Sequence, residues 1–298
     1  MLSSRVIYLA PKLRKAILLA IQHDVWNTAK AAAYSGMLML FPTMLVVTTL
    51  LAMVPEGASM MGEFRGNFLH LLPGDSAALL RLSQTPHHMQ PTRLLISAAS
   101  LSFFAGLGTM NSLMEGFRRA YRLPQRQWGS LWQQQVRALL LVLIVVVPLA
   151  FASLVLVFGR AIEQWMIELA NHEMRQVVIF FWRMVRWAVT LLTGVAVLGA
   201  LYHFGTRRTE HWVRVMPGAI AATLAWFPTT LAFGWYVTRE ANYSMYYGPF
   251  SAGIATLVWL YITAFSALLG AELNGVLFRA RRDSEDAVAQ DARTAAQA

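Results

Sequence analysis

The sequence predicts an all-α, polytopic membrane protein with about six transmembrane helices, and three observations carry that prediction. Hydrophobic residues make up 57% of the 298 residues and charged residues only 13%, whereas a soluble domain is typically about 25% charged. The apolar residues gather in runs long enough to cross a bilayer. Lys and Arg flank these runs, as topology-determining residues do. We therefore interpret the net charge of +10 as an orientation signal and expect no nucleic-acid partner.

The first 28 residues predict a cytoplasmic interfacial helix ahead of the first apolar run. Leu13 and Ile17 share one helical face, whereas Lys12 and Lys15 share another. The basic face suits anionic lipid. Packing of this helix against the cytoplasmic end of the bundle stays open as the alternative. The segment has no uninterrupted apolar core and no clear cleavage site, so the sequence does not predict a signal peptide here.

Six apolar runs then meet the requirement of about 20 residues for a membrane span. They cover residues 31–54, 94–113, 136–158, 187–204, 216–237 and 251–271. Residues 55–93, between the first two spans, predict two short amphipathic helices on the outer surface. Residues 1–282 thus form one transmembrane domain, and the polar residues 283–298 predict a disordered cytoplasmic tail.

The distribution of cationic side chains predicts the orientation. With the N-terminus inside, 17 of the 25 Lys and Arg fall on the cytoplasmic side and 8 on the other side. Cytoplasmic loops carry such an excess. We expect both termini in the cytoplasm, an even number of spans, and membrane lipids as partners.

The sequence carries no recognisable catalytic, metal or cofactor site. It contains no Cys, which excludes thiolate ligands and cysteine nucleophiles. His70, His87 and His88 have no nearby carboxylate pattern and make a poor zinc signature. No Lys follows a Gly-rich loop, and the acidic residues do not cluster as a metal nuclease requires. We expect a protein that is not an enzyme and that uses no cofactor.

Several motifs resemble one known family. The first span reads Ala-rich from Ala31 to Phe-Pro at Pro42, and the C-terminal half contains Pro217-Gly-Ala219, Leu257-Val-Trp-Leu-Tyr261 and Leu269-Gly-Ala-Glu-Leu-Asn274. In order and spacing these resemble the YihY/BrkB bacterial inner-membrane proteins, also labelled ribonuclease BN. The resemblance implies six spans, cytoplasmic ends and a bacterial inner membrane, but little biochemistry.

Glu272 is the most distinctive candidate for a functional residue, because it is the only charged side chain between Ser251 and Phe278. Depending on where the last span begins, it lies at the cytoplasmic edge or inside hydrocarbon. Two interpretations stay open: a structural polar clasp, with Arg118 or Lys30 as the partner, or a site for a proton or substrate group. Asn274 and the small residues around it favour close approach of a neighbouring helix.

Further candidates lie in other spans. Pro42, Pro148 and Pro228 each free a backbone carbonyl within a span, which indicates either a plain kink or a cavity. Arg183 and Arg186 lie in the outer leaflet if the fourth helix begins early, where they snorkel or attract an anionic headgroup.

Small residues recur every four positions in the second span. Ala98, Ser102 and Gly106 therefore share one helix-packing face. This face could serve within one chain or between chains, so a homo-oligomer stays open.

These observations lead to two functional hypotheses. The first is a transporter or translocator-type protein for a lipid or another hydrophobic or amphipathic envelope molecule, bound between broken helices. The second is a non-transporting membrane scaffold that recruits envelope proteins through the outer helices of residues 55–93 and the basic cytoplasmic loops. The ribonuclease label finds no chemical support in the sequence, and no residue pattern names a substrate.

Overall fold

Seven long helices make up the described part of the chain. The computed structural model describes residues 2–52, 91–124, 128–169, 172–206, 211–239 and 251–297. The helices are α1 Leu2–Gln22, α2 Val25–Ala52, α5 Pro91–Ala120, α6 Leu131–Leu169, α7 His172–Gly205, α8 Trp212–Arg239 and α10 Ser251–Gln297. Within these residues no strand occurs, and the predicted all-α class is confirmed. Most of the predicted outer helical segment, residues 55–90, lies outside the described residues.

Five of the described helices are long and apolar enough to cross a membrane. The qualifying stretches are Val25–Val47, Leu131–Leu149, Arg175–Gly205, Trp212–Val237 and Ser251–Asp291. Helix α5 has 30 residues and is less apolar because Ser, Thr and Asn interrupt it, but it lies against α2 along the bundle. The count agrees with the prediction of about six transmembrane helices.

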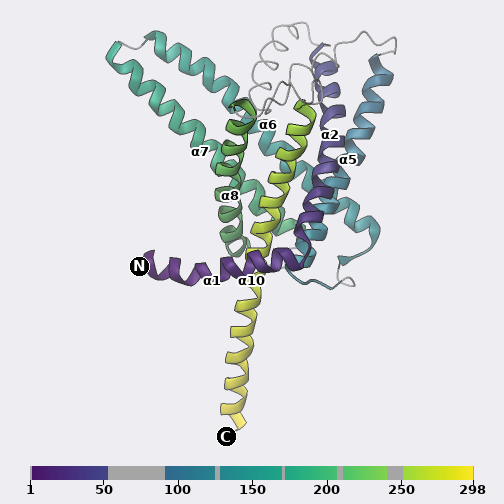
Figure 1. Ribbon diagram of the computed structural model, residues 1–298, viewed down its shortest axis with the longest axis vertical. Helices are drawn as coiled ribbons and strands as arrows, with labels where there is room; N and C mark the ends of the chain where they lie inside the picture. Colours follow the sequence, from purple (N-terminus) through teal and green to yellow (C-terminus); the bar gives the residue numbers. More distant parts are fainter. Residues whose placement is uncertain are drawn as a thin grey trace.

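Helix α10 occupies the middle of the bundle and contacts α1, α2, α5 and α8 (Figure 1). Helices α2 and α5 lie side by side, and α7 packs against both α6 and α8. The distal parts of α6 and α7 extend away from the other helices at the upper left of Figure 1. The bundle is therefore tightest around α10 and most open around α6.

The turn at His23 and Asp24 sends α1 across one end of the bundle, at right angles to the other helices in Figure 1. Asp24 adopts a left-handed conformation with φ of 57°, which Asp tolerates better than most residues. Its carboxylate accepts hydrogen bonds from the Asn27 side chain, and Thr28 donates to its carbonyl. These bonds fix the direction in which α2 leaves the turn.

The largest differences from the predicted span boundaries occur at three helix ends. Helix α6 continues to Leu169. Helix α7, which contains the predicted fourth span, begins at His172, because the apolar residues from Val177 to Trp182 extend it toward its N-terminus. Helix α10 continues to Gln297, which corrects the predicted disordered tail. Ala, the residue with the highest helix propensity, is the commonest residue in that segment, which favours continuation of the helix.

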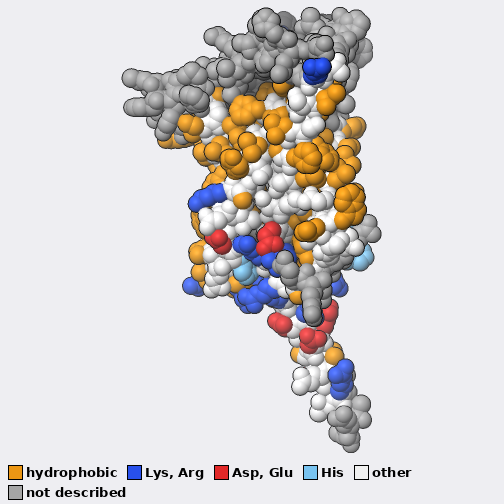
Figure 2. Space-filling model, turned by 90° about the vertical axis from the view of Figure 1, so that its right-hand side faces the viewer, with side chains coloured by type: hydrophobic (Ala, Val, Ile, Leu, Met, Phe, Trp, Pro, Cys, Tyr) orange, Lys and Arg blue, Asp and Glu red, His pale blue; other side chains and the backbone are white. Residues whose placement is uncertain are grey.

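Charged side chains gather at one end of the bundle. Figure 2 shows hydrophobic side chains around the middle of the molecule, with Lys, Arg, Asp and Glu concentrated below them. We call this the basic end: it holds α1, the last turn of α5 and the first turn of α8. The exposed apolar middle and the charged end are the surface that a bilayer-spanning bundle requires.

Candidate functional site

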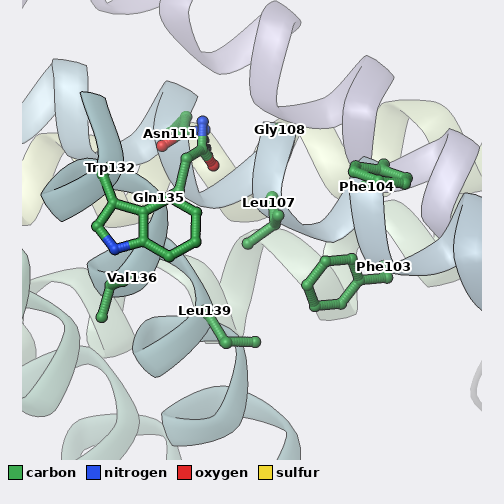
Figure 3. Close-up of a pocket in the computed structure, with 9 residues that line it drawn as sticks. All are labelled: Phe103, Phe104, Leu107, Gly108, Asn111, Trp132, Gln135, Val136 and Leu139. Carbon is green, nitrogen blue, oxygen red and sulfur yellow. Dashed lines mark hydrogen bonds between the residues drawn. The ribbon is translucent and has the colours of Figure 1, made fainter.

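A lateral groove lies between α5 and α6. It has a volume of about 600 Å³ and is lined by side chains from both helices (Figure 3). From α5 it is lined by Phe103, Phe104, Leu107, Gly108 and Asn111, and from α6 by Trp132, Gln135, Val136 and Leu139. Apart from Leu107, the large apolar side chains are substantially exposed. The groove is therefore an apolar channel on the surface of the bundle, and not an enclosed core cavity.

The polar groups of the groove lie at one end. The Asn111 side chain donates a hydrogen bond to the Gln135 side chain at 3.3 Å, and Figure 3 shows Trp132 beside this amide pair, with Phe103 and Phe104 at the opposite end. Gln135 lies in the second turn of α6, close to the basic end. The groove thus changes from polar to apolar with distance from the basic end.

An ion cluster lies one helical turn beyond the amide pair. Glu115 follows Asn111 by four residues on α5 and accepts hydrogen bonds from Arg118 Nε at 2.7 Å and Arg119 Nε at 3.0 Å. The hydrogen bond from Arg118 lowers the pKa of Glu115, against the opposing effect of partial burial. The same bond raises the pKa of Arg118. The cluster keeps one excess positive charge beside the polar end of the groove.

Glu272 lies fully buried in α10 near the basic end. Its Oε1 is 2.7 Å from Nδ1 of His23, in the turn between α1 and α2. Its Oε2 has no hydrogen-bond partner among the described residues. The two partners considered from sequence are engaged elsewhere, since Arg118 binds Glu115 and Lys30 donates to Asn27. The carboxylate therefore joins α10 to the turn that positions α1.

Asn274 joins α10 to α8. Its Oδ1 accepts a hydrogen bond from the backbone N–H of Gly218, and its Nδ2 donates to the carbonyl of Val215, both at 2.8 Å. The helices touch here, because a Cβ on Gly218 would lie 2.3 Å from the Gly270 carbonyl oxygen. Close helix crossings of this kind depend on small residues. This contact leaves no passage between α8 and α10 at this level.

The prolines and arginines singled out from sequence lie apart from the groove. Pro42 is buried in α2, Pro228 is exposed on α8, and neither residue lines the groove. A threonine follows each proline directly: Thr43 follows Pro42, and Thr229 follows Pro228. The hydroxyl of each threonine donates a hydrogen bond to the backbone carbonyl four residues earlier. Hydrogen bonds of this kind often bend a helix. These observations fit local bends in α2 and α8.

Arg183 and Arg186 both lie inside α7, which begins at His172. Arg183 is exposed and Arg186 is half-buried. From Gly205, at the basic end, 19 residues lead back to Arg186, which is about 29 Å of helix at 1.5 Å per residue. Arg186 is thus close to a full bilayer thickness from the basic end.

The small-residue face of α5 packs toward α2. Ala98 is buried, and the Ser102 hydroxyl shares a hydrogen bond with that of Thr43. A Cβ on Gly106 would lie 3.3 Å from the sulfur of Met39. Within one chain, these three residues serve the contact between α2 and α5.

The lining of the groove was not singled out from the sequence. Asn111 lies near the end of one apolar run, Gln135 is the last of three consecutive glutamines just before another, and only the packing of α5 against α6 brings their amides together. The available signal was Asn111, an amide inside an apolar run, which is unfavourable in lipid without a partner. Among the described residues, no group of three or more His, Asp or Glu could hold a metal ion.

Comparison with known proteins identifies relatives along nearly the whole chain. The family model described as virulence factor BrkB matches residues 19–295. A protein of Bacillus subtilis named ribonuclease-like, YfkH, is 26% identical over 262 residues, which cover 87% of this chain and 92% of YfkH. A UPF0761 membrane protein of Aromatoleum aromaticum is 26% identical over 84% of this chain and 60% of its own length. No solved structure matches.

Proposed function

Since this chain belongs to the BrkB family of membrane proteins, we propose that it accommodates a lipid or a similar amphipathic molecule in the groove between α5 and α6. The observation that carries the proposal is the polarity of the groove, which is polar near the basic end and apolar farther away. One leaflet of a bilayer has the same gradient, from headgroup to acyl chain. An acyl chain would lie along Phe103, Phe104 and Leu107, with the polar part of the molecule near Asn111 and Gln135.

The position of the groove favours entry from the side of the bundle. The groove opens between two helices of the apolar middle, where lipid chains are the surrounding solvent. By contrast, Glu272 is paired with His23, and the crossing of Gly218 over Gly270 closes the adjoining space between α8 and α10. We therefore place the amphipathic molecule at the lateral groove and assign Glu272 to joining helices.

The basic end defines an orientation within this proposal. Cationic residues concentrate on the cytoplasmic side of membrane proteins, so we propose that the basic end faces the cytoplasm of a bacterial inner membrane, with both termini on that side. The groove then opens to the inner leaflet. The role is non-enzymatic. The scaffold hypothesis depends on the basic cytoplasmic loops and on residues 55–93, and the latter lie almost entirely outside the described residues.

Photocrosslinking to lipid tests occupation of the groove. The full chain, in vesicles containing a phospholipid with a photoreactive acyl chain, is irradiated and digested, and the labelled peptides are identified by mass spectrometry. We expect labelling to concentrate on the lining of α5 and α6. Leu139→Trp fills the groove and should reduce this labelling several-fold, whereas Leu231→Trp, an equally apolar change at an exposed position of α8, should not.

Labelling spread evenly around the apolar middle, and unchanged by Leu139→Trp, would contradict the proposal.

Movement of the bound lipid is a separate question, measured as the transbilayer exchange of a fluorescent phospholipid in the same vesicles. If the protein moves lipid through the groove, Leu139→Trp should slow the exchange and Leu231→Trp should not. Exchange equal to that of empty vesicles would leave accommodation without transport as the function.

A further inference from the structure

Helix α1 presents three different surfaces around its axis: a buried surface, an exposed apolar flank and an exposed polar flank. One surface packs against α10, where the buried Ala16 and Leu19 form a cluster with Leu273 and Val276, and the buried Ala20 joins the main core. Together with the bond between His23 and Glu272, this cluster holds α1 at the basic end. The helix is therefore a fixed part of the fold, and its remaining surfaces have defined directions.

The second surface is apolar and uncovered. Leu13, Ile17 and Ile21 are spaced by four residues and lie along one flank, with exposed fractions of 43%, 47% and 59%. Lys15 and Gln22 lie on the opposite flank and are exposed, and Arg14 is exposed between the two flanks. A row of three large aliphatic side chains in water is unfavourable, because each would gain by leaving water.

We infer that this apolar flank of α1 docks into the interfacial layer of the membrane, with anionic lipid headgroups as its partner. Figure 1 shows α1 running across the bundle, in the direction of the membrane plane, and Figure 2 places the basic end where the apolar middle stops. An amphipathic helix at that level buries its apolar side at the boundary between headgroups and acyl chains.

The cationic residues complement this partner. The stem of Arg14 is long enough to carry its charge to nearby phosphates while α1 lies flat, and Lys15 on the far flank adds to the positive charge at this level. Cations near an anionic leaflet are attracted to it, and the attraction weakens as salt screens it. A second protein copy would cover the apolar flank equally well but would leave these charges without a complement. This inference is independent of the groove between α5 and α6.

Single-cysteine labelling tests the docking directly, because the chain contains no Cys. Ile17→Cys on the apolar flank and Lys15→Cys on the opposite flank each provide one thiol for an environment-sensitive fluorophore. The full chain is placed in nanodiscs that hold one copy and contain phosphatidylglycerol. We expect blue-shifted emission at position 17, quenched by a lipid with a nitroxide near its headgroup, and water-like emission with little quenching at position 15.

Three results would overturn the inference. Equal emission and quenching at the two positions would mean that α1 does not lie against the membrane. A blue shift at position 17 that occurs only in discs with two copies would identify a second copy as the partner. Quenching that is unchanged when phosphatidylcholine replaces phosphatidylglycerol would reject anionic lipid. Both positions are exposed, and size-exclusion chromatography before labelling checks that each variant folds.

Discussion

The buried pair of His23 and Glu272 gives a quantitative prediction about stability. The two side chains are only 18% and 1% exposed, and the bond joins residues 249 positions apart in sequence. His23→Ala removes the described hydrogen-bond partner of this carboxylate and leaves both oxygens buried. Loss of a hydrogen bond to a charged group costs about 1.5–3 kcal/mol, whereas breaking a fully buried ion pair costs about 3–5 kcal/mol.

Two arginines reduce the expected cost. Arg122 and Arg279 lie near enough to Glu272 to stabilise its charge without bonding to it. We therefore expect His23→Ala to destabilise the protein by about 2–3 kcal/mol, in the lower part of these ranges. In the Glu272→Gln background the charge is absent, so the same histidine substitution should cost less than about 1 kcal/mol, a coupling that a double-mutant cycle measures.

Thermal unfolding of the purified protein, followed by the loss of the monodisperse peak in size-exclusion chromatography, provides the assay. His211→Ala, at an exposed position just before α8, is the control and should change the midpoint little. The reasoning would be refuted if His23→Ala were as mild as this control. It would equally be refuted if the histidine substitution had the same effect with and without Glu272→Gln.

Three other predictions concern stability. Gly270→Ala should lower the melting temperature strongly, because its Cβ would lie 2.5 Å from a backbone oxygen of α8 and overpacking costs about 1–3 kcal/mol or more; Gly234→Ala meets nothing within 4 Å and should be harmless. Asn274→Leu removes two buried hydrogen bonds and should cost about 2 kcal/mol in thermal unfolding at about 1 kcal/mol per bond. Arg118 lowers the pKa of Glu115, so the carboxylate stabilises the fold above its unfolded pKa, and this contribution disappears as the pH falls through the lower folded pKa. Melting curves recorded between neutral pH and about pH 3 should therefore show a smaller acid-induced loss for Glu115→Gln than for the unchanged protein; equal losses would contradict this assignment.

The bundle architecture could be predicted from the sequence because hydropathy and charge act locally. Each apolar run is long enough to identify its own helix, and the Lys and Arg groups between runs indicate which helix ends lie together. Helix ends were less predictable. Helix α7 begins at His172 because helix propagation continues past Arg183 and Arg186, although the uninterrupted apolar run starts only at Trp187.

The contacts of the candidate site depend on tertiary packing and could be predicted only in part. Glu272 stood out because an isolated carboxylate in an apolar helix needs a partner. Nothing local identifies His23 as that partner, because it lies in a turn at the opposite end of the chain. Asn111 and Gln135 form a pair only after α5 and α6 have packed together. Residue types thus indicated that partners were required, but not which residues supply them.

The short stretch of α10 from Ala267 to Arg279 has a consequence for how the molecule can move. Within little more than three turns it accepts a hydrogen bond from Tyr202 of α7, holds α8 through Asn274, binds His23, and donates from Arg279 to the carbonyl of Ala120 at the end of α5. Rotation or sliding of α10 would break all four attachments together, so the helices joined here move as one block. Helix α6 contacts mainly α5 and α7, and the hydrogen bond between Asn111 and Gln135 joins it to α5. Widening of the groove therefore corresponds to a swing of α6 against a stationary frame, and measured distances should change across the groove while those around α10 stay constant.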